Sequence, residues 1–337
     1  MMFVFYSSGS NAQWTKYNNP SGALPFSLMI HNDTIYMGTV ANGIYRSTDG
    51  GSSWTQINNG ITSMQIWAIN QVGAAIFASS LGGTVYKSIN GGDSWVLSNT
   101  GVSSTAIIKK FVSFNGKIFA ATSNTGILIS NDDGSSWAQH NSGIVGLVGG
   151  EIVVMENDLY ATVNNKRVYK YDTTNQKWIA KGNTGLPNQS IGCMTYIKDS
   201  SQNVTFFVGN GNSNEVAKST NGGDNWSVVK NGLPNVGVYS ILGIGTDVYL
   251  GNDYGVYHTT NQGVDWIDIS GFERASPAKF LSKSSTDLYV LQGGNLWKKS
   301  LASLKVEDKH KSVENQSLRI YPNPSSGIFN IEIDENL

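Results

Sequence analysis

Short apolar strands recur along the chain at nearly constant intervals. Each ends in an aromatic residue, continues through a small-residue turn such as ANG or LGG, and enters another apolar strand such as IYRS. Such runs, bounded by Gly and Asn, are typical of β-strands. The aromatic residues lie 40 to 42 residues apart, except for one step of 47, at Tyr36, Phe77, Phe119, Tyr160, Phe207, Tyr249 and Tyr289. The pattern predicts an all-β protein built from repeats of about 40 residues.

A tryptophan recurs in step with these strands, at Trp14, Trp54, Trp95, Trp137, Trp178, Trp226 and Trp266. Five of the seven follow the pattern S/T-x-D/N-x-G-x-x-W. A sixth copy, before Trp178, keeps the spacing but lacks the Gly and the Asp. The motif residues are Ser47, Asp49, Gly51 and Trp54; Ser88, Asn90, Gly92 and Trp95; Ser130, Asp132, Gly134 and Trp137; Ser219, Asn221, Gly223 and Trp226; Thr259, Asn261, Gly263 and Trp266.

Each repeat accommodates four short strands, which is the content of one propeller blade. The last repeat, around Trp297, has no motif and no terminal Trp, whereas the strand at Trp14 has nothing before it. The N-terminal strand therefore completes the last blade and closes the ring, which removes exposed sheet edges. We predict a seven-bladed β-propeller of four-stranded blades over residues 13–303.

The motif resembles the Asp-box (BNR) repeat of sialidases, sortilin-type receptors, xyloglucan-degrading enzymes and photosystem II assembly factors. The Ser or Thr hydroxyl and the Asp or Asn oxygen can accept hydrogen bonds from turn amides, Gly supplies an unusual backbone angle, and Trp covers the hairpin. A calcium loop needs several alternating carboxylates, but one Asp or Asn per loop is usual here. We expect structural loops without metal. The resemblance implies that they lie between the outer strands, away from any active site.

A functional site is expected on the opposite face, where the inner strands begin. Counting ten residues back from each strand-ending aromatic reaches Phe26, Trp67, Lys109, Gly150, Ile197, Tyr239 and Lys279, with Tyr196 beside Ile197. The aromatic members could form a stacking platform for sugars or peptides; alternatively they plug the central channel or pack between blades. Ligand-binding candidates are Phe26, Trp67, Lys109, Tyr196, Tyr239, Arg274 and Lys279.

Catalysis has weaker support in the sequence. A sialidase binds its substrate carboxylate with clustered arginines, and only Arg167 and Arg274 could face the site. Other glycosidases need two carboxylates flanking the scissile bond. The remaining acids include Glu151, Asp253 and Glu273, and no recurring motif pairs them. The xyloglucan-degrading enzymes that share the resemblance also use two propellers, whereas this chain has one.

The amino-acid composition limits the classes of partner that the protein can bind. The net charge is −1, which gives no footprint for nucleic acid. No apolar run approaches the ~20 residues of a membrane helix. The single Cys193 rules out an internal disulfide framework. We expect a monomer without a cofactor.

The two ends differ in composition from the repeats. Residues 1–12 look like the remnant of a signal peptide, and residues 304–317 form a charged linker. Residues 318–337 resemble the start of the type A sorting domain of the Bacteroidetes type IX secretion system, through Tyr321, Pro322, Asn323, Pro324 and Gly327. This resemblance implies export to the cell surface or medium with the type IX machinery as partner, and the tail is shorter than the family's domain.

Three functions follow as hypotheses. The first is a secreted, non-catalytic propeller that binds a glycan, peptide or protein opposite the Asp-boxes. The second is a polysaccharide-acting glycoside hydrolase using Glu151, Asp253 or Glu273. The third is a protein-binding assembly scaffold.

Overall fold

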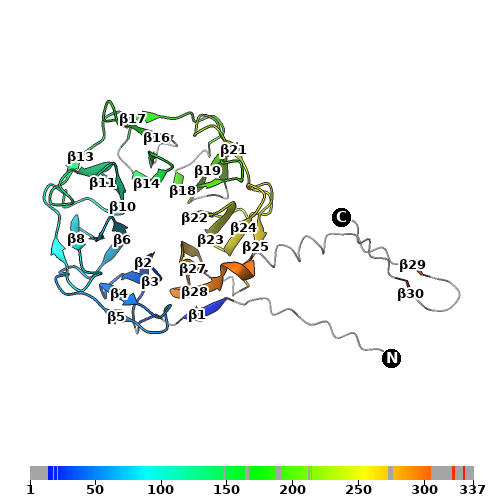
Figure 1. Cartoon of the computed structure of the whole chain (residues 1–337), viewed down its shortest axis with the longest axis horizontal. Coiled ribbons are helices and arrows are strands. Elements are labelled where there is room, and N and C mark those ends of the chain that lie inside the picture. Colours follow the sequence, from blue (N-terminus) through cyan, green and yellow to red (C-terminus); the bar gives the residue numbers. More distant parts are fainter. Residues whose placement is uncertain are drawn as a thin grey trace.

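The computed structural model describes residues 14–17, 19–20, 22–146, 149–163, 167–186, 191–211, 213, 215–271 and 276–304, and the backbone of 321–322 and 329–330. The blade-forming residues build seven four-stranded antiparallel sheets arranged in a ring (Figure 1). This confirms the predicted seven-bladed β-propeller. The proposed signal remnant, most of the charged linker and most of the tail lie outside the described residues.

The strands follow the chain from the axis outwards in each blade. Blades 1 to 3 contain β2 (Pro25–His31), β3 (Thr34–Thr39), β4 (Ile44–Ser47) and β5 (Thr55–Gln56); β6 (Ile66–Val72), β7 (Ala75–Ser80), β8 (Thr84–Ser88) and β9 (Val96–Leu97); β10 (Ile108–Phe114), β11 (Lys117–Thr122), β12 (Ile127–Ser130) and β13 (Ala138–Gln139). Blades 4 to 6 contain β14 (Gly149–Met155), β15 (Asp158–Val163), β16 (Arg167–Asp172) and β17 (Lys177–Ala180); β18 (Ile191–Lys198), β19 (Val204–Asn210), β20 (Val216–Ser219) and β21 (Ser227–Val228); β22 (Val238–Ile244), β23 (Asp247–Asn252), β24 (Gly255–Thr259) and β25 (Ile267–Asp268).

Blade 7 is closed by the N-terminal strand. It contains β26 (Ala278–Lys283), β27 (Asp287–Gln292), β28 (Asn295–Ser300) and, on its outer edge, β1 (Thr15–Tyr17). Thr15 pairs with Lys298 and Tyr17 with Leu296. The two ends of the repeat region are thereby held in one sheet, as predicted. Opening the ring would expose the edge of β28 and separate blade 7 from its neighbour.

Every inner strand has a β-bulge at or next to its second residue. In β6, for example, Ile66 pairs with Ser80 and Ala68 with Ser79, so Trp67 is the extra residue. The same shift occurs in five other inner strands, and in β14 the irregularity spans Gly150 and Glu151 opposite Thr162. Because neighbouring strands are antiparallel, these bulges lie on the same side as the loops between second and third strands. We call this side the bulge face and the opposite side the motif face.

Large apolar side chains fill the space between adjacent blades. Phe77 of blade 2 contacts Phe111 and Trp137 of blade 3, with ring centroids 5.6 and 6.1 Å apart, and all three are almost fully buried. The Trp137 Nε1 also donates to the Ser98 carbonyl of blade 2, at 2.7 Å. Deleting such a ring costs about 3–5 kcal/mol. The recurring Trp therefore joins neighbouring blades as well as covering its own hairpin.

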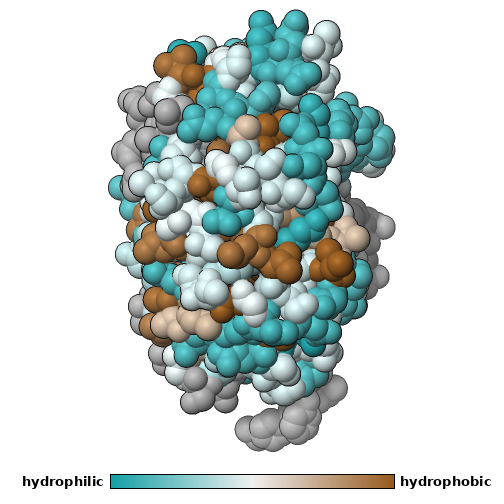
Figure 2. Space-filling view, turned by 90° about the vertical axis from the view of Figure 1, so that its left-hand side faces the viewer, coloured by the Kyte–Doolittle hydropathy of each residue, from teal (hydrophilic) through white to brown (hydrophobic). Residues whose placement is uncertain are grey.

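The outer rim is mostly polar. Figure 2 shows one side of it, where hydrophobic side chains form a broken band across a largely hydrophilic surface. The exposed apolar residues of the rim include Val96 and Leu97 of β9. Scattered exposure of this kind is ordinary for a folded protein. Within the described ranges, no helix is long and apolar enough to cross a membrane.

Candidate functional site on the bulge face

The seven bulges place one residue from each blade around the start of the inner strands. We call this set the bulge rim: Phe26, Trp67, Lys109, Gly150, Gly192, Tyr239 and Lys279. Counting ten residues back from the strand-two aromatics found six of these positions. A bulge directs its extra side chain out of the regular alternation, so the rim is a feature of backbone geometry repeated in every blade.

Tyr196 is not on the rim, which corrects its grouping with the other candidates. It lies near the end of β18, opposite Phe206, and is half-buried against the core between blades 4 and 5. Gly192 occupies the rim position instead. Fifteen residues separate Gly192 from Phe207, against ten in the other blades, because the β18–β19 hairpin is longer and turns through residues capped by Asp199. A fixed count therefore ends too far along the strand.

Three aromatic rings pack together at the rim. The Phe26 and Trp67 rings meet edge to face with centroids 4.5 Å apart, and the Phe280 ring lies 6.5 Å from that of Phe26. All three side chains are half-buried. The Trp67 Nε1 is buried and has no hydrogen-bond partner among the described residues. Phe280 was missed from the sequence, although it directly follows a rim residue.

Two rim lysines flank this aromatic group. Lys109 belongs to blade 3 and Lys279 to blade 7, so the order round the ring is Lys279, Phe26, Trp67, Lys109 on four consecutive blades. Both lysines are exposed, and neither has an ion pair in the part of the chain that the structure describes. This arc combines apolar surface with two cationic groups.

Tyr239 forms a separate pair with a carboxylate. Its hydroxyl donates at 2.9 Å to Oδ1 of Asp253, which lies in the loop between β23 and β24. Burial and this hydrogen bond to a carboxylate raise the pKa of Tyr239. The phenol therefore stays protonated at neutral pH, which is unfavourable for a tyrosine nucleophile.

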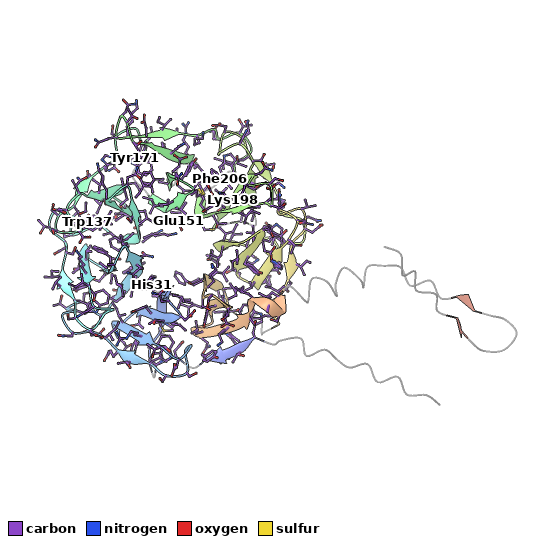
Figure 3. The ribbon with its side chains drawn as sticks, in the orientation of Figure 1. His31, Trp137, Glu151, Tyr171, Lys198 and Phe206 are labelled. Carbon is purple, nitrogen blue, oxygen red and sulfur yellow. The ribbon has the colours of Figure 1, made fainter. Side chains whose placement is uncertain are left out.

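Glu151 lies on the inner side of the ring (Figure 3). It pairs with Lys110 of the neighbouring inner strand, Nζ to Oε1 at 2.5 Å, and both side chains are partly buried. Glu151 is in blade 4 and Asp253 in blade 6, with blade 5 between them. Each of the two carboxylates is bound by a neighbouring side chain. Glu273 and Arg274 lie outside the described residues.

The five motif loops lie on the opposite face and are held by a repeated hydrogen-bond pattern. In the loop of blade 3, the Ser130 hydroxyl donates to Asp132 Oδ1 at 2.8 Å and accepts from Gly134 N at 2.8 Å. Ser136 donates to Asp132 through its amide at 2.9 Å and through its hydroxyl. These hydrogen bonds, with that from the Ser136 side chain the strongest, lower the pKa of Asp132 to about 2. The loop oxygens are thus occupied by the loop itself.

The same acceptors recur where Asn replaces Asp. Asn90, Asn221 and Asn261 accept from the hydroxyl two residues earlier and from the amide four residues later. An amide oxygen suffices because its function is to accept turn hydrogen bonds. No cluster of three or more His, Cys, Asp or Glu side chains arranged for a metal occurs in the described part of the chain.

A basic side chain fastens each of several motif loops to the preceding blade, a contact that sequence reasoning missed. Arg46 donates to the Gly91 carbonyl at 2.9 Å, Lys87 to that of Asp133 at 2.7 Å, and Lys218 to that of Gln262 at 2.9 Å. All three occupy the position opposite the strand-two aromatic. In blades 3 and 6, whose following blades lack the full motif, this position is Ile129 and His258.

A cavity of about 410 Å³ lies beside blade 4 on the motif side, and no rim residue lines it. Its walls are Asp158, Lys170, Tyr171, Asp172, Thr173, Ile179 and Lys181. Lys170, the counterpart of Arg46 and Lys87, pairs with Asp158 of its own blade at 2.7 Å. Lys181 instead pairs with Asp224 of the next motif loop, at 2.6 Å.

Comparison with known proteins agrees with this architecture. Residues 74–232 match the DUF6242 β-propeller domain. A xyloglucanase from Paenibacillus sp is 28% identical over 176 residues, which are 48% of this chain and 16% of the enzyme. The chain therefore corresponds to a small part of that enzyme.

Two solved structures resemble the whole ring. YCF48 bound to D1 peptide superposes with a TM-score of 0.67 at 16% identity, covering 88% of this chain and 99% of YCF48. The extracellular domain of the putative hybrid two-component system BT4673 from B. thetaiotaomicron gives 0.67 at 13% identity, covering 83% of this chain and 41% of that one. At these identities the likeness concerns the fold alone, and the chain is a seven-bladed β-propeller whose residues 74–232 match the DUF6242 propeller domain.

Proposed function

We propose that the protein is a non-catalytic β-propeller that binds a glycan at the bulge rim. The observation that carries the proposal is the half-buried aromatic pair of Phe26 and Trp67 at the rim. Aromatic faces pack against the apolar faces of sugar rings, and the exposed parts of these half-buried rings offer such a surface. The sequence similarity to a xyloglucanase supports a carbohydrate over other ligands.

Binding of a broad glycan array by the full chain tests the proposal. We expect retention of one glycan class, weakened about tenfold or more in Trp67→Ala, which removes the stacking surface. Ile179→Ala is the matched control, since Ile179 is exposed on β17 away from the rim. Silence across the array, or equal loss in the control, would contradict the proposal.

Glycoside hydrolysis is the second candidate, favoured by the same xyloglucanase similarity. It requires two carboxylates at the scissile bond. Against it, Glu151 is paired with Lys110 and Asp253 with Tyr239, on blades 4 and 6. Suppose the protein releases reducing ends from a glycan that it binds, and Glu151→Gln abolishes this release while binding is retained. Glycoside hydrolysis then replaces non-catalytic glycan binding as the function.

An assembly scaffold that binds a peptide is the third candidate. Its support is the likeness to YCF48, which was solved with a D1 peptide. The likeness concerns the fold alone, so a peptide ligand rests on analogy. Capture of peptides with no response to glycans would favour it.

We also infer that the five motif loops are Asp-boxes and that the protein is exported by the type IX route. The loop hydrogen bonds support the first inference. For the second, the supporting features are the Tyr-Pro-Asn-Pro sequence and the pairing of β29 (Tyr321–Pro322) with β30 (Phe329–Asn330). In a Bacteroidetes host, deleting residues 318–337 should retain the protein inside the cell. Unchanged surface or medium levels would overturn this.

A further inference from the structure

We propose that the glycan bound at the bulge rim is acidic, and that its carboxylates pair with Lys109 and Lys279 while its sugar rings pack on Phe26 and Trp67. This inference rests on the proposed function and adds the chemical class of the ligand. A polyuronide, in which every sugar carries a carboxylate, has the required combination of apolar ring faces and negative charge.

The first support is the state of the two lysines. Elsewhere in the described chain, basic side chains commonly have a carboxylate partner: Arg46 with Asp93, Lys87 with Asp133, Lys181 with Asp224 and Lys198 with Glu156. Lys109 and Lys279 are exposed and have no such partner among the described residues. Two cationic groups held at equivalent bulge positions are thus available to a ligand.

The described acids of the same face, Glu151, Glu215 and Asp253, belong to blades 4, 5 and 6. Glu151 is neutralised by Lys110, at 2.5 Å. Asp253 accepts from Tyr239 at 2.9 Å, in blade 6. None of the three belongs to the arc formed by blades 7, 1, 2 and 3, whose described bulge-face residues carry the two lysines and no acid. The local charge of the arc therefore favours an anionic ligand, although the chain as a whole has a net charge of −1.

The second support is the order of groups round the ring. The aromatic pair lies between the two lysines, and the Phe280 ring, next to Lys279 in sequence, contacts Phe26 at a centroid distance of 6.5 Å. Lys109 is in β10, whose Phe111 amide donates to Asn70 of β6, so β10 lies beside the strand that carries Trp67. A ligand packed on the aromatic pair would extend its flanking units over the lysines.

The third support is the room left at the rim position of blade 5. In blades 4 and 5 the rim residues are Gly150 and Gly192, which add no side chain. A Cβ at Gly192 would meet only the Gly211 amide within 4 Å, at 3.7 Å, whereas Gly150 lies close to the Thr162 hydroxyl and the Ile191 carbonyl. No rim side chain of blade 5 therefore blocks a polymer that extends beyond the aromatic arc, which suits an extended chain rather than a single small sugar.

The test compares polyuronides with their neutral counterparts. Polygalacturonate, alginate and carboxyl-reduced polygalacturonate are titrated against the full chain by calorimetry. We expect at least one polyuronide to bind about tenfold tighter than the reduced polymer, because two exposed ion pairs are lost on reduction. The difference should shrink as salt is added. Lys109→Gln with Lys279→Gln should remove it, whereas Lys117→Gln with Lys177→Gln, the same charge change away from the rim, should not.

The outcomes separate this inference from the proposed function. Equal binding of reduced and acidic polymers, or binding of neutral glycans with no response to either polyuronide, overturns the acidic ligand and leaves glycan binding intact. No binding of any glycan overturns both. If polyglutamate binds as tightly as the best polyuronide and depends on the same lysines, the ligand is an acidic peptide and the glycan assignment is wrong.

Discussion

Replacing Gly134 by Ala in the motif loop of blade 3 isolates the packing contribution of one position. Gly134 has φ of +85°, and a Cβ there would lie 2.5 Å from Phe77 Cε1 and 2.6 Å from its Cζ. Phe77 is fully buried against Phe111 and Trp137, so the ring has no free space to enter. The substitution thus adds a steric clash to the cost of a left-handed backbone.

Gly223, at the same motif position in blade 5, is the matched control. Its φ is +88°, but its added Cβ would meet nothing closer than Trp226 Cζ2 at 3.4 Å. Both substitutions place Ala at positive φ, which costs about 1–2 kcal/mol. Only Gly134→Ala also overpacks the core, by about 1–3 kcal/mol. The difference between the two variants therefore measures the clash with Phe77.

Thermal unfolding followed by circular dichroism gives the comparison. For domains of this size, 1 kcal/mol shifts Tm by roughly 2–4 °C. Gly134→Ala should therefore melt at least about 2 °C below Gly223→Ala, and both below the wild type. Equal Tm values would refute the reasoning, because they would mean that Phe77 moves without cost. Phe77→Leu combined with Gly134→Ala should show a favourable coupling energy in a double-mutant cycle.

Three further predictions concern single side chains. Hydrogen bonds lower the pKa of Asp132 to about 2. The ionised carboxylate therefore stabilises the fold fully above pH about 4, the pKa of Asp in the unfolded chain, and this contribution disappears as the pH falls through about 2. A titration midpoint of Asp132 near 4, measured by NMR, would contradict this. Lys87→Met should lower the free energy of unfolding by about 1–2 kcal/mol, because it removes a charge-assisted hydrogen bond to the Asp133 carbonyl. The control Lys170→Met, which breaks only an exposed pair, should change it by less than about 1 kcal/mol. Burial raises the pKa of the Cys193 thiol, so Ellman's reagent at pH 8 should react with it only after denaturation. Stoichiometric labelling of the native protein would contradict this, because it would show that the core around Cys193 opens.

Repetition along the chain was sufficient to predict the architecture. The strand period, the seven blades and the closure of blade 7 by the strand after Trp14 all follow from local signals: apolar runs, small-residue turns and one Trp per unit. Each signal acts over a few residues, and a repeated unit can bury its apolar faces only against its neighbours. The loop chemistry was also readable, because Ser130, Asp132 and Gly134 interact within a single turn.

The candidate site could be predicted only in part. Counting from the strand-two aromatics reached six rim positions, because the inner hairpins have equal lengths in those blades. It failed in blade 5, where five additional residues in the β18–β19 hairpin made the count end at Ile197, beside Tyr196, instead of at Gly192. The count also missed Phe280, whose importance comes from its contact with Phe26 of another blade.

The sequence by itself thus determined the unit, the number of units and the way the ring closes. Only the tertiary structure decided which side chains meet: Lys110 with Glu151, Phe26 with Trp67, and Arg46 with the Gly91 carbonyl. The physical reason is separation along the chain. These contacts join residues about 40 apart on different blades, where no local hydrogen bond or turn constrains their pairing, so they exist only once the ring has brought neighbouring blades together.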